Sequence, residues 1–408
     1  MVPTLDSQRL LQDLETLGQI GLDSSGGINR MAYSPADQEA RAWVEEQMRE
    51  VGLDVRTDQA GNSMGVYPGE LRHLSPMALG SHTDTVPEGG RHDGALGVLG
   101  GLACVRALRD AGLRLRHSVE VINFAAEEAT MAGATLGSRA MAGLLEPTLV
   151  EQPAWDGRSV AEHLREAGLD PAAISHAQRP EGSLAAYLEL HIEQGGALDD
   201  TGVPIGVVTG IVGIRRYAVS FEGFANHAGT TPMASRSDAL VMAAPFILTV
   251  RDVAVGQGIV GTVGTLRLEP GAPNVIPGRV ELGVEIRGLQ EDELDRAEAE
   301  LEQQAQEAGA EFRRVSTKPP VESDPGLLDV LVAACDELGV AYRTMPSGAG
   351  HDAMCIAAIA PQAMLFVPSR GGVSHCPDEY TDPESCVAGA RVLLAALLKL
   401  DARLDADS

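Results

Sequence analysis

Three apolar segments in the first half of the chain each end at side chains that can bind metal ions. PMALGSH ends at His82, VEVINF is followed by Glu127 and Glu128, and YLELH ends at His191. Open α/β sheets bind ligands beyond the carboxyl ends of their strands, so these segments are predicted as core strands with a shared site at their ends. A helix is predicted from Gly94 to Leu108, after a glycine-bounded loop. We therefore expect an α/β domain built on a mixed sheet.

Two more candidate ligands complete this set. Asp93 lies in GGRHDG and His375 lies in GVSHCPDE, far along the chain. Three imidazoles and two carboxylates form the mixed nitrogen and oxygen set that borderline divalent metals prefer. The full set is His82, Asp93, Glu128, His191 and His375. It predicts a hydrolase centre with two divalent ions, which would be Zn, Mn, Co or Ni.

Composition excludes several classes of partner. The chain has 408 residues, of which 44% are hydrophobic, so it is long enough to form two domains. A formal net charge of −27 argues against nucleic acid and against anionic membrane surfaces. The five cysteines form no C-x-x-C pair, which favours a reducing, cytoplasmic setting. The first residues lack a secretory pattern and no uninterrupted apolar stretch of membrane-spanning length occurs, so we expect neither export nor a membrane span.

The pattern of the chain changes after Thr209. Strands and helices then follow in the order expected for a compact α+β insert with an antiparallel sheet. The predicted elements are a strand over residues 211–223, a helix over 237–255, strands over 259–270 and 279–288, and a charged helix over 291–309. The predicted domains are thus a catalytic domain of residues 1–209 and 322–408, and an inserted domain of residues 210–321. His375 belongs to the catalytic domain.

Eight separated motifs carry a resemblance to a known family. They are GSHTDTV, GGRHDGALGVLGG, AAEEAT, LELHIEQGG, NHAGTTPM, PNVIPG, SGAGHDA and GVSHCPDEYT. In this order they resemble the M20 metallohydrolases, and especially the N-carbamoyl-L-amino acid amidohydrolase branch. The resemblance implies that His82, Asp93 and His191 hold one metal ion. It implies that Asp93, Glu128 and His375 hold the other, so Asp93 would bridge the two.

The same resemblance implies catalytic roles for three more residues. Glu127 would take a proton from the attacking water and pass it to the departing nitrogen. Asp84, two residues after His82, would orient that imidazole, although it could instead cap a turn. His227 is similar to a family histidine that reaches the site of a neighbouring subunit, where it would stabilise the oxyanion. The inserted domain would then serve for dimerisation, in a homodimer, and as a lid; structural packing is the alternative for His227.

Substrate recognition is expected to need a receptor for a carboxylate. Arg287 offers a planar fork for bidentate pairing, unless it forms a structural ion pair instead. Further polar contacts are expected from Asn274, from Gln194 in HIEQG, and from Gly350 and His351 in SGAGHDA. The expected substrate is therefore a small-molecule carboxylate.

The predicted reaction is hydrolysis of an N-carbamoyl-L-amino acid to the amino acid, carbon dioxide and ammonia. GSRAMAG, from Gly137 to Gly143, favours this branch. The alternatives are an allantoate or ureidoglycolate amidohydrolase, a β-ureidopropionase, and an M20 aminoacylase or dipeptidase. A binding protein without activity is disfavoured because the base and every predicted ligand are present.

Overall fold

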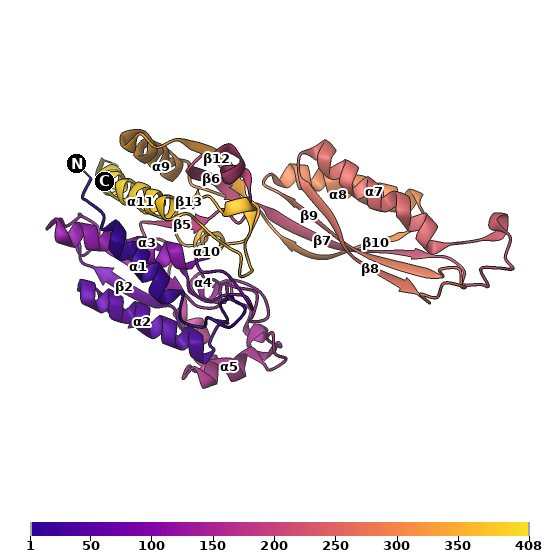
Figure 1. Ribbon diagram of the computed structural model, residues 1–408, viewed down its shortest axis with the longest axis horizontal. Helices are drawn as coiled ribbons and strands as arrows, with labels where there is room; N and C mark the ends of the chain where they lie inside the picture. The colour runs from indigo at the N-terminus through magenta and orange to yellow at the C-terminus, as the bar shows by residue number, and fades with distance from the viewer. Residues whose placement is uncertain (1, 407–408) are drawn as a thin grey trace. The chain divides into compact units, whose positions relative to one another are not determined.

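The computed structural model describes residues 2–406 and divides into two compact units, which are described separately (Figure 1). The main unit comprises the chain up to Thr209 and again from Ser323. The inserted unit is Gly210–Glu322. These boundaries differ from those predicted from the sequence by a single residue at the second junction.

A mixed nine-stranded sheet forms the centre of the main unit, which confirms the predicted fold class, and only β11 and the last two residues of β6 lie past the unit boundaries given above. Its order is β1-β2-β4-β3-β5-β13-β6-β11, and β12 pairs with β6. The strands are β1 (Asp54–Thr57), β2 (Ser63–Tyr67), β3 (Met77–His82), β4 (Val119–Phe124), β5 (Ala186–Ile192), β6 (Ile205–Ile211), β11 (Val321–Glu322), β12 (Tyr342–Ser347) and β13 (Gln362–Val367). Strands β4, β3, β5 and β13 are parallel, so their carboxyl ends lie at one edge of the sheet.

These four parallel strands are buried along their whole length. Continuous burial is typical of parallel strands that are covered on both faces. The helices of the main unit are α1 (Ser7–Leu17), α2 (Pro35–Val51), α3 (Ala95–Asp110), α4 (Leu136–Met141), α5 (Val160–Glu166), α6 (Ala197–Thr201), α9 (Pro325–Leu338), α10 (Asp352–Ile356) and α11 (Pro383–Ala406). Short 3-10 turns occupy Pro147–Glu151, Pro171–Ala177 and Arg370–Gly372.

Helix α3 lies close against the sheet because glycine faces the strands. A Cβ atom added at Gly97 would lie 2.4 Å from the carbonyl oxygen of Leu190. The helix is buried along almost its whole length and joins the large hydrophobic core with α1, α9 and α11. This close packing brings the loop that precedes α3, which carries Asp93, against the ends of β3 and β5.

The inserted unit is an antiparallel four-stranded sheet with two helices on one face (Figure 1). Its elements are β7 (Gly213–Glu222), a 3-10 turn (Met233–Ser235), α7 (Ala239–Gln257), β8 (Val260–Glu269), β9 (Arg279–Gly288), α8 (Glu291–Glu307) and β10 (Glu311–Lys318). The sheet order is β10-β7-β9-β8. Burial alternates along β7 and β9, so one face of each packs under the helices.

Helix α7 exposes a stripe of apolar side chains. Val241, Leu248 and Val255 are 67%, 61% and 74% exposed and are spaced seven residues apart, which places them on one side of the helix. By length and composition α7 is the one described helix that could cross a membrane, but it contains Arg251 and Asp252. Its other side packs in the core of the inserted unit. The stripe therefore lies outside the core of the inserted unit.

Candidate metal centre

The predicted ligands converge at the edge of the sheet where the parallel strands end. His82 is the last residue of β3, Glu128 follows β4, and His191 lies near the end of β5. Asp93 lies in the loop between β3 and α3, and His375 lies in the segment after β13. In the register of the sheet, His82 is level with Phe124 of β4, and His191 is level with Phe366 of β13. The fold thus gathers all five predicted ligands.

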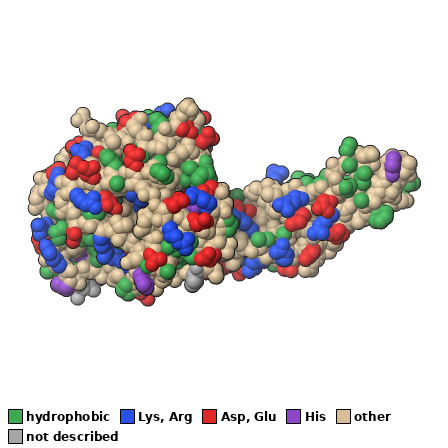
Figure 2. All heavy atoms as spheres, turned by 90° about the horizontal axis from the view of Figure 1, so that it is seen from below, with side chains coloured by type: hydrophobic (Ala, Val, Ile, Leu, Met, Phe, Trp, Pro, Cys, Tyr) green, Lys and Arg blue, Asp and Glu red, His purple; other side chains and the backbone are tan. Residues whose placement is uncertain are grey.

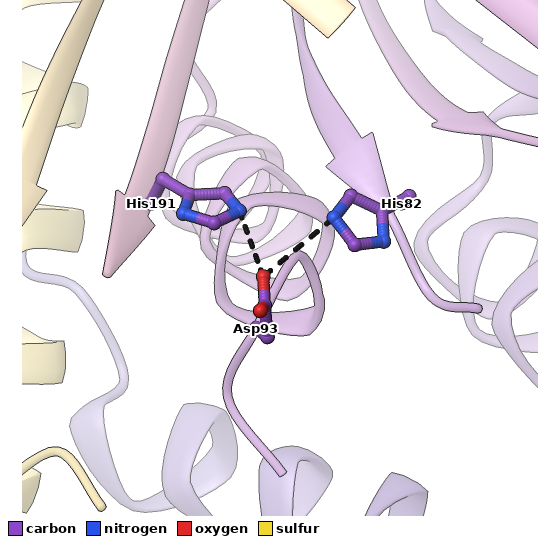
Figure 3. Close-up of side chains that lie close together, drawn as sticks. All are labelled: His82, Asp93 and His191. Carbon is purple, nitrogen blue, oxygen red and sulfur yellow. Dashed lines mark ion pairs between the residues drawn. The ribbon is translucent and has the colours of Figure 1, made fainter. Parts of the chain in front are cut away.

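Asp93 lies at the centre of this cluster, and each of its two oxygens faces a different group. Asp93 Oδ1 is 3.7 Å from His82 Nε2 and 3.1 Å from His191 Nε2 (Figure 3). Asp93 Oδ2 is 3.2 Å from His375 Nε2, which is itself 3.4 Å from Glu128 Oε1. Two groups of three potential ligands therefore share one carboxylate.

The two buried imidazoles are oriented by backbone carbonyl groups. His82 Nδ1 lies 3.1 Å from the carbonyl oxygen of Asp84, and His191 Nδ1 lies 2.9 Å from that of Ile192. Donation by each Nδ1 turns Nε2 toward Asp93 and makes Nε2 the ligand atom when the imidazole is neutral. A Cβ atom at Gly94 would lie 2.5 Å from the His82 ring, so only glycine allows the Asp93 loop to come this close.

The electrostatics of the cluster favour bound cations. Burial lowers the pKa of His82 to about 4, which keeps this imidazole neutral. Burial also lowers the pKa of His191, but the hydrogen bond to Asp93 and its charge outweigh burial and raise that pKa to about 9. Burial and the charge of Asp93 raise the pKa of Glu128 to about 8, and burial with Glu128 raises the pKa of Glu127 well above its usual range. Crowded buried carboxylates with imidazoles fit a site for divalent metal ions.

Residues 78–399 match the family described as Peptidase family M20/M25/M40. The chain belongs to this family. The chain is 39% identical to an N-carbamoyl-L-amino acid amidohydrolase of Geobacillus stearothermophilus, covering 97% of this chain and 99% of that one. It is 34% identical to a ureidoglycolate hydrolase of Oryza sativa subsp. japonica, covering 97% and 85%. A hydantoinase/carbamoylase family amidase of Burkholderia multivorans has a similar structure, with a TM-score of 0.89, 34% identity and coverage of 97% and 98%.

The predicted resemblance to the M20 metallohydrolases is therefore confirmed. As a member of this family, the protein is an amidohydrolase, an enzyme that hydrolyses amide or ureido bonds. Enzymes of the M20 family depend on metal ions, and the shared-carboxylate cluster supplies candidate ligand groups for them.

In this M20 enzyme Asp84 has a different role from the one predicted. Its carboxylate lies 3.7 Å from His82 Nδ1, which is too long for a hydrogen bond. The two carboxylate oxygens instead accept the backbone N–H groups of Glu127 and Glu128, at 3.2 and 3.1 Å. The side chain of Asp84 therefore holds the turn that carries Glu127 and Glu128, which is the capping alternative, and its carbonyl group lies against His82 Nδ1.

Arg41, which was not predicted from the sequence, holds the carboxyl end of β4. It precedes the residues that match the family. Its buried guanidinium donates to the carbonyl groups of Asn123 at 3.2 Å and of Phe124, and it pairs with Asp37 at 3.2 Å. The next turn contains Ala126 with a φ of +54°, a backbone conformation that L-residues rarely adopt and that the surrounding contacts must hold. The position of Glu127 thus depends on residues from three parts of the chain.

Two predicted substrate contacts belong to the cluster itself. Gln194 Nε2 donates to Asp93 Oδ2 at 2.8 Å and lies 3.2 Å from His375 Nε2. His351 is 2% exposed, packs edge-on against His191 at 4.5 Å between ring centroids, and bonds to Ser347 Oγ at 2.9 Å. His351 thus packs against His191, and its contact with substrate stays a prediction.

Glu189 is a buried acid that the sequence analysis did not single out. It forms a third group of potential ligands with His191 and His351. However, its oxygens accept from Ser81 Oγ at 2.8 Å and from the N–H of Ala353 at 3.1 Å. With its oxygens engaged in this way, Glu189 is better placed to join β3, β5 and α10 than to bind an ion.

The remaining predicted residues lie in the inserted unit, apart from the exposed Gly350. His227 is exposed, and its Nδ1 accepts the N–H groups of Gly229 and Thr230 at 3.0 and 3.2 Å, so its Nε2–H is left as a donor. Asn274 lies beside it, since its carbonyl group accepts the N–H of Ala228 at 3.0 Å. Arg287 Nε donates to Glu285 at 2.7 Å, so the ion pair named as the structural alternative is present.

Proposed function

We propose that the protein hydrolyses the ureido C–N bond of N-carbamoyl-L-amino acids to the L-amino acid, carbon dioxide and ammonia. The observation that carries this proposal is the Asp93 carboxylate shared by two ligand groups, with the side chain of Glu127 beside them. The amidohydrolase with 39% identity over nearly its full length supports the substrate class. Ureidoglycolate is the main alternative, because a ureidoglycolate hydrolase is 34% identical.

The ligand groups would hold two divalent ions. His82, Asp93 and His191 would hold the first ion, and Asp93, Glu128 and His375 the second. When bound, such ions polarise the substrate carbonyl group and lower the pKa of water toward neutrality.

Glu127 would then move the proton. Its Oε2 lies 3.7 Å from His82 Nε2, and the side chain is only 6% exposed. A carboxylate in this position can accept the proton of the attacking water and then pass it to the departing nitrogen.

The substrate carboxylate would be bound by polar groups of the inserted unit and of the cluster. Arg287, whose Nε pairs with Glu285, would bind the substrate carboxylate, and Gln194 and Gly350 would contact the ureido end. We expect no nucleic acid or membrane partner. A cytoplasmic location is expected, since all five cysteines are unpaired.

The inserted unit would join two copies of the chain. The exposed stripe of Val241, Leu248 and Val255 on α7 and the edge strand β8, with Val260 62% exposed, offer apolar surface for a second copy. Figure 2 shows hydrophobic side chains at the surface of this unit, among acidic and basic ones. A homodimer would let His227 reach the site of the partner.

Mixing two inactive variants tests the homodimer and the role of His227 together. We expect Glu127→Gln and His227→Ala to be nearly inactive when each is assayed alone. After subunit exchange about one quarter of wild-type activity should return. Half of the random dimers then contain one copy of each variant, and one of the two sites in such a dimer is complete. A charge on the α7 stripe, Leu248→Asp, should prevent recovery. If mixing restores nothing although the two chains exchange, His227 does not act on the partner's site.

Assays of several substrates side by side test the proposed reaction. Ammonia release from N-carbamoyl-L-methionine should exceed release from allantoate and ureidoglycolate, and a chelator should stop it. Faster turnover of allantoate or ureidoglycolate would assign the enzyme to that alternative. Hydrolysis of dipeptides alone would assign it to the peptidases of the family.

A further inference from the structure

Glu379 joins the two loops that carry Asp93 and His375. It is 4% exposed, and its Oε1 accepts the backbone N–H groups of His92 and Asp93, both at 3.1 Å. Its Oε2 accepts the hydroxyl of Ser374 at 2.7 Å and the N–H of His375 at 3.3 Å. An ionised carboxylate has about four acceptor sites, and four donors meet this one.

The loops are shaped for this contact. A Cβ atom at Gly90 would lie 2.0 Å from the carboxylate of Glu379, so only glycine lets the first loop approach it. In the second loop His375 has a φ of +57°, a conformation that persists where the surroundings hold it. The bond from its N–H to Glu379 is one such restraint.

The other histidines do not depend on this contact. His82 and His191 lie on buried strands, and each ring bonds to a carbonyl group beside it. His375 lies in a loop, and its side chain is 49% exposed. Loss of the Glu379 contacts should therefore displace His375 more than the two strand histidines.

We propose that Glu379 is a positioning residue that holds His375 at the distance from Asp93 required by the second ion. Its removal should weaken the group of Asp93, Glu128 and His375 more than the group of His82, Asp93 and His191, because both groups lose the restraint on Asp93 but only the former loses the restraint on His375. This inference rests on the proposed two-ion site.

Calorimetric titration of metal-free protein with Mn²⁺ alone tests the inference. Wild type should bind two ions. In Glu379→Gln an amide NH₂ replaces one acceptor and faces backbone donors, so we expect one of the two affinities to fall roughly 10–100-fold and the other to fall clearly less. Glu337→Gln, which removes a surface ion pair with Lys399, is the control that should leave both unchanged.

Ser374→Ala is the milder second variant, and it tests the positioning role of Glu379 if Glu379→Gln does not fold. It removes the hydroxyl that donates to Glu379 Oε2 at 2.7 Å and that lies 3.3 Å from Asp93 Oδ2, the oxygen that faces His375, so the same affinity should fall about five-fold. Equal weakening of both sites, or no change in either variant, would overturn the positioning role. A wild-type protein that binds a single ion would instead contradict the proposed two-ion site.

Discussion

Replacing Glu127 with Gln should lower kcat by roughly 10²–10⁴-fold, the usual contribution of a general base, and leave the metal content unchanged. Glutamine has nearly the same shape but cannot accept the proton of water. Glu127 lies outside both ligand groups around Asp93, although its Oε2 is 3.7 Å from His82 Nε2. Its loss should therefore affect proton transfer and spare metal binding.

The neighbouring residue provides the matched control. Glu128→Gln makes the same chemical change one position along, on a side chain that faces His375 at 3.4 Å. It should lower the metal content as well as the rate of ammonia release. Near-normal kcat in Glu127→Gln would remove Glu127 from the mechanism, and loss of metal in that variant would make it a ligand.

The ligands could be predicted from the sequence because of the way parallel strands are arranged. The carboxyl ends of β3, β4 and β5 share an edge of the sheet, so residues directly after each apolar segment come together. His82, Glu128 and His191 follow from this rule. Asp93 and His375 lie in loops, where the glycine-rich and acidic clusters GGRHDG and GVSHCPDE mark them as candidates.

The residues that hold the ligands in place could not be predicted in the same way. Asp84, Arg41 and Glu379 act mainly on backbone N–H and carbonyl groups far along the chain. The type of a side chain does not reveal which backbone atom that side chain will contact. The sequence therefore predicts that Asp84 orients the nearest imidazole. A signal was present in Gly90 and Gly94, because glycines beside a predicted ligand indicate a close approach.

Strand β10 was not predicted from the sequence for a related reason. EFRRVSTK is exposed along most of its length, so it lacks the alternation that marks a half-buried strand. It forms because β7 offers a free edge, and Arg314 of β10 pairs with Glu298 of α8. Its place was therefore decided by tertiary contacts.

Replacing Asp93 with Asn should abolish binding at both proposed ion sites. Each oxygen of Asp93 faces a different histidine group, whereas an amide keeps one acceptor and presents a donor on its other side. Loss of residues that merely orient ligands costs about 10–100-fold in metal affinity, so loss of a shared charged ligand should exceed 100-fold at each site. Activity should fall to background.

Thermal unfolding with and without Mn²⁺ measures the loss of metal binding independently of activity. An ion at 100 times its Kd should stabilise the wild type by about 2.7 kcal/mol per site, and Asp93→Asn should show no such gain. His375→Ala, which removes a ligand of the second group alone, should keep the gain from the first ion. An Asp93→Asn protein that behaved like His375→Ala would show that Asp93 serves a single ion, because a bridging carboxylate cannot be removed from one site without loss at the other.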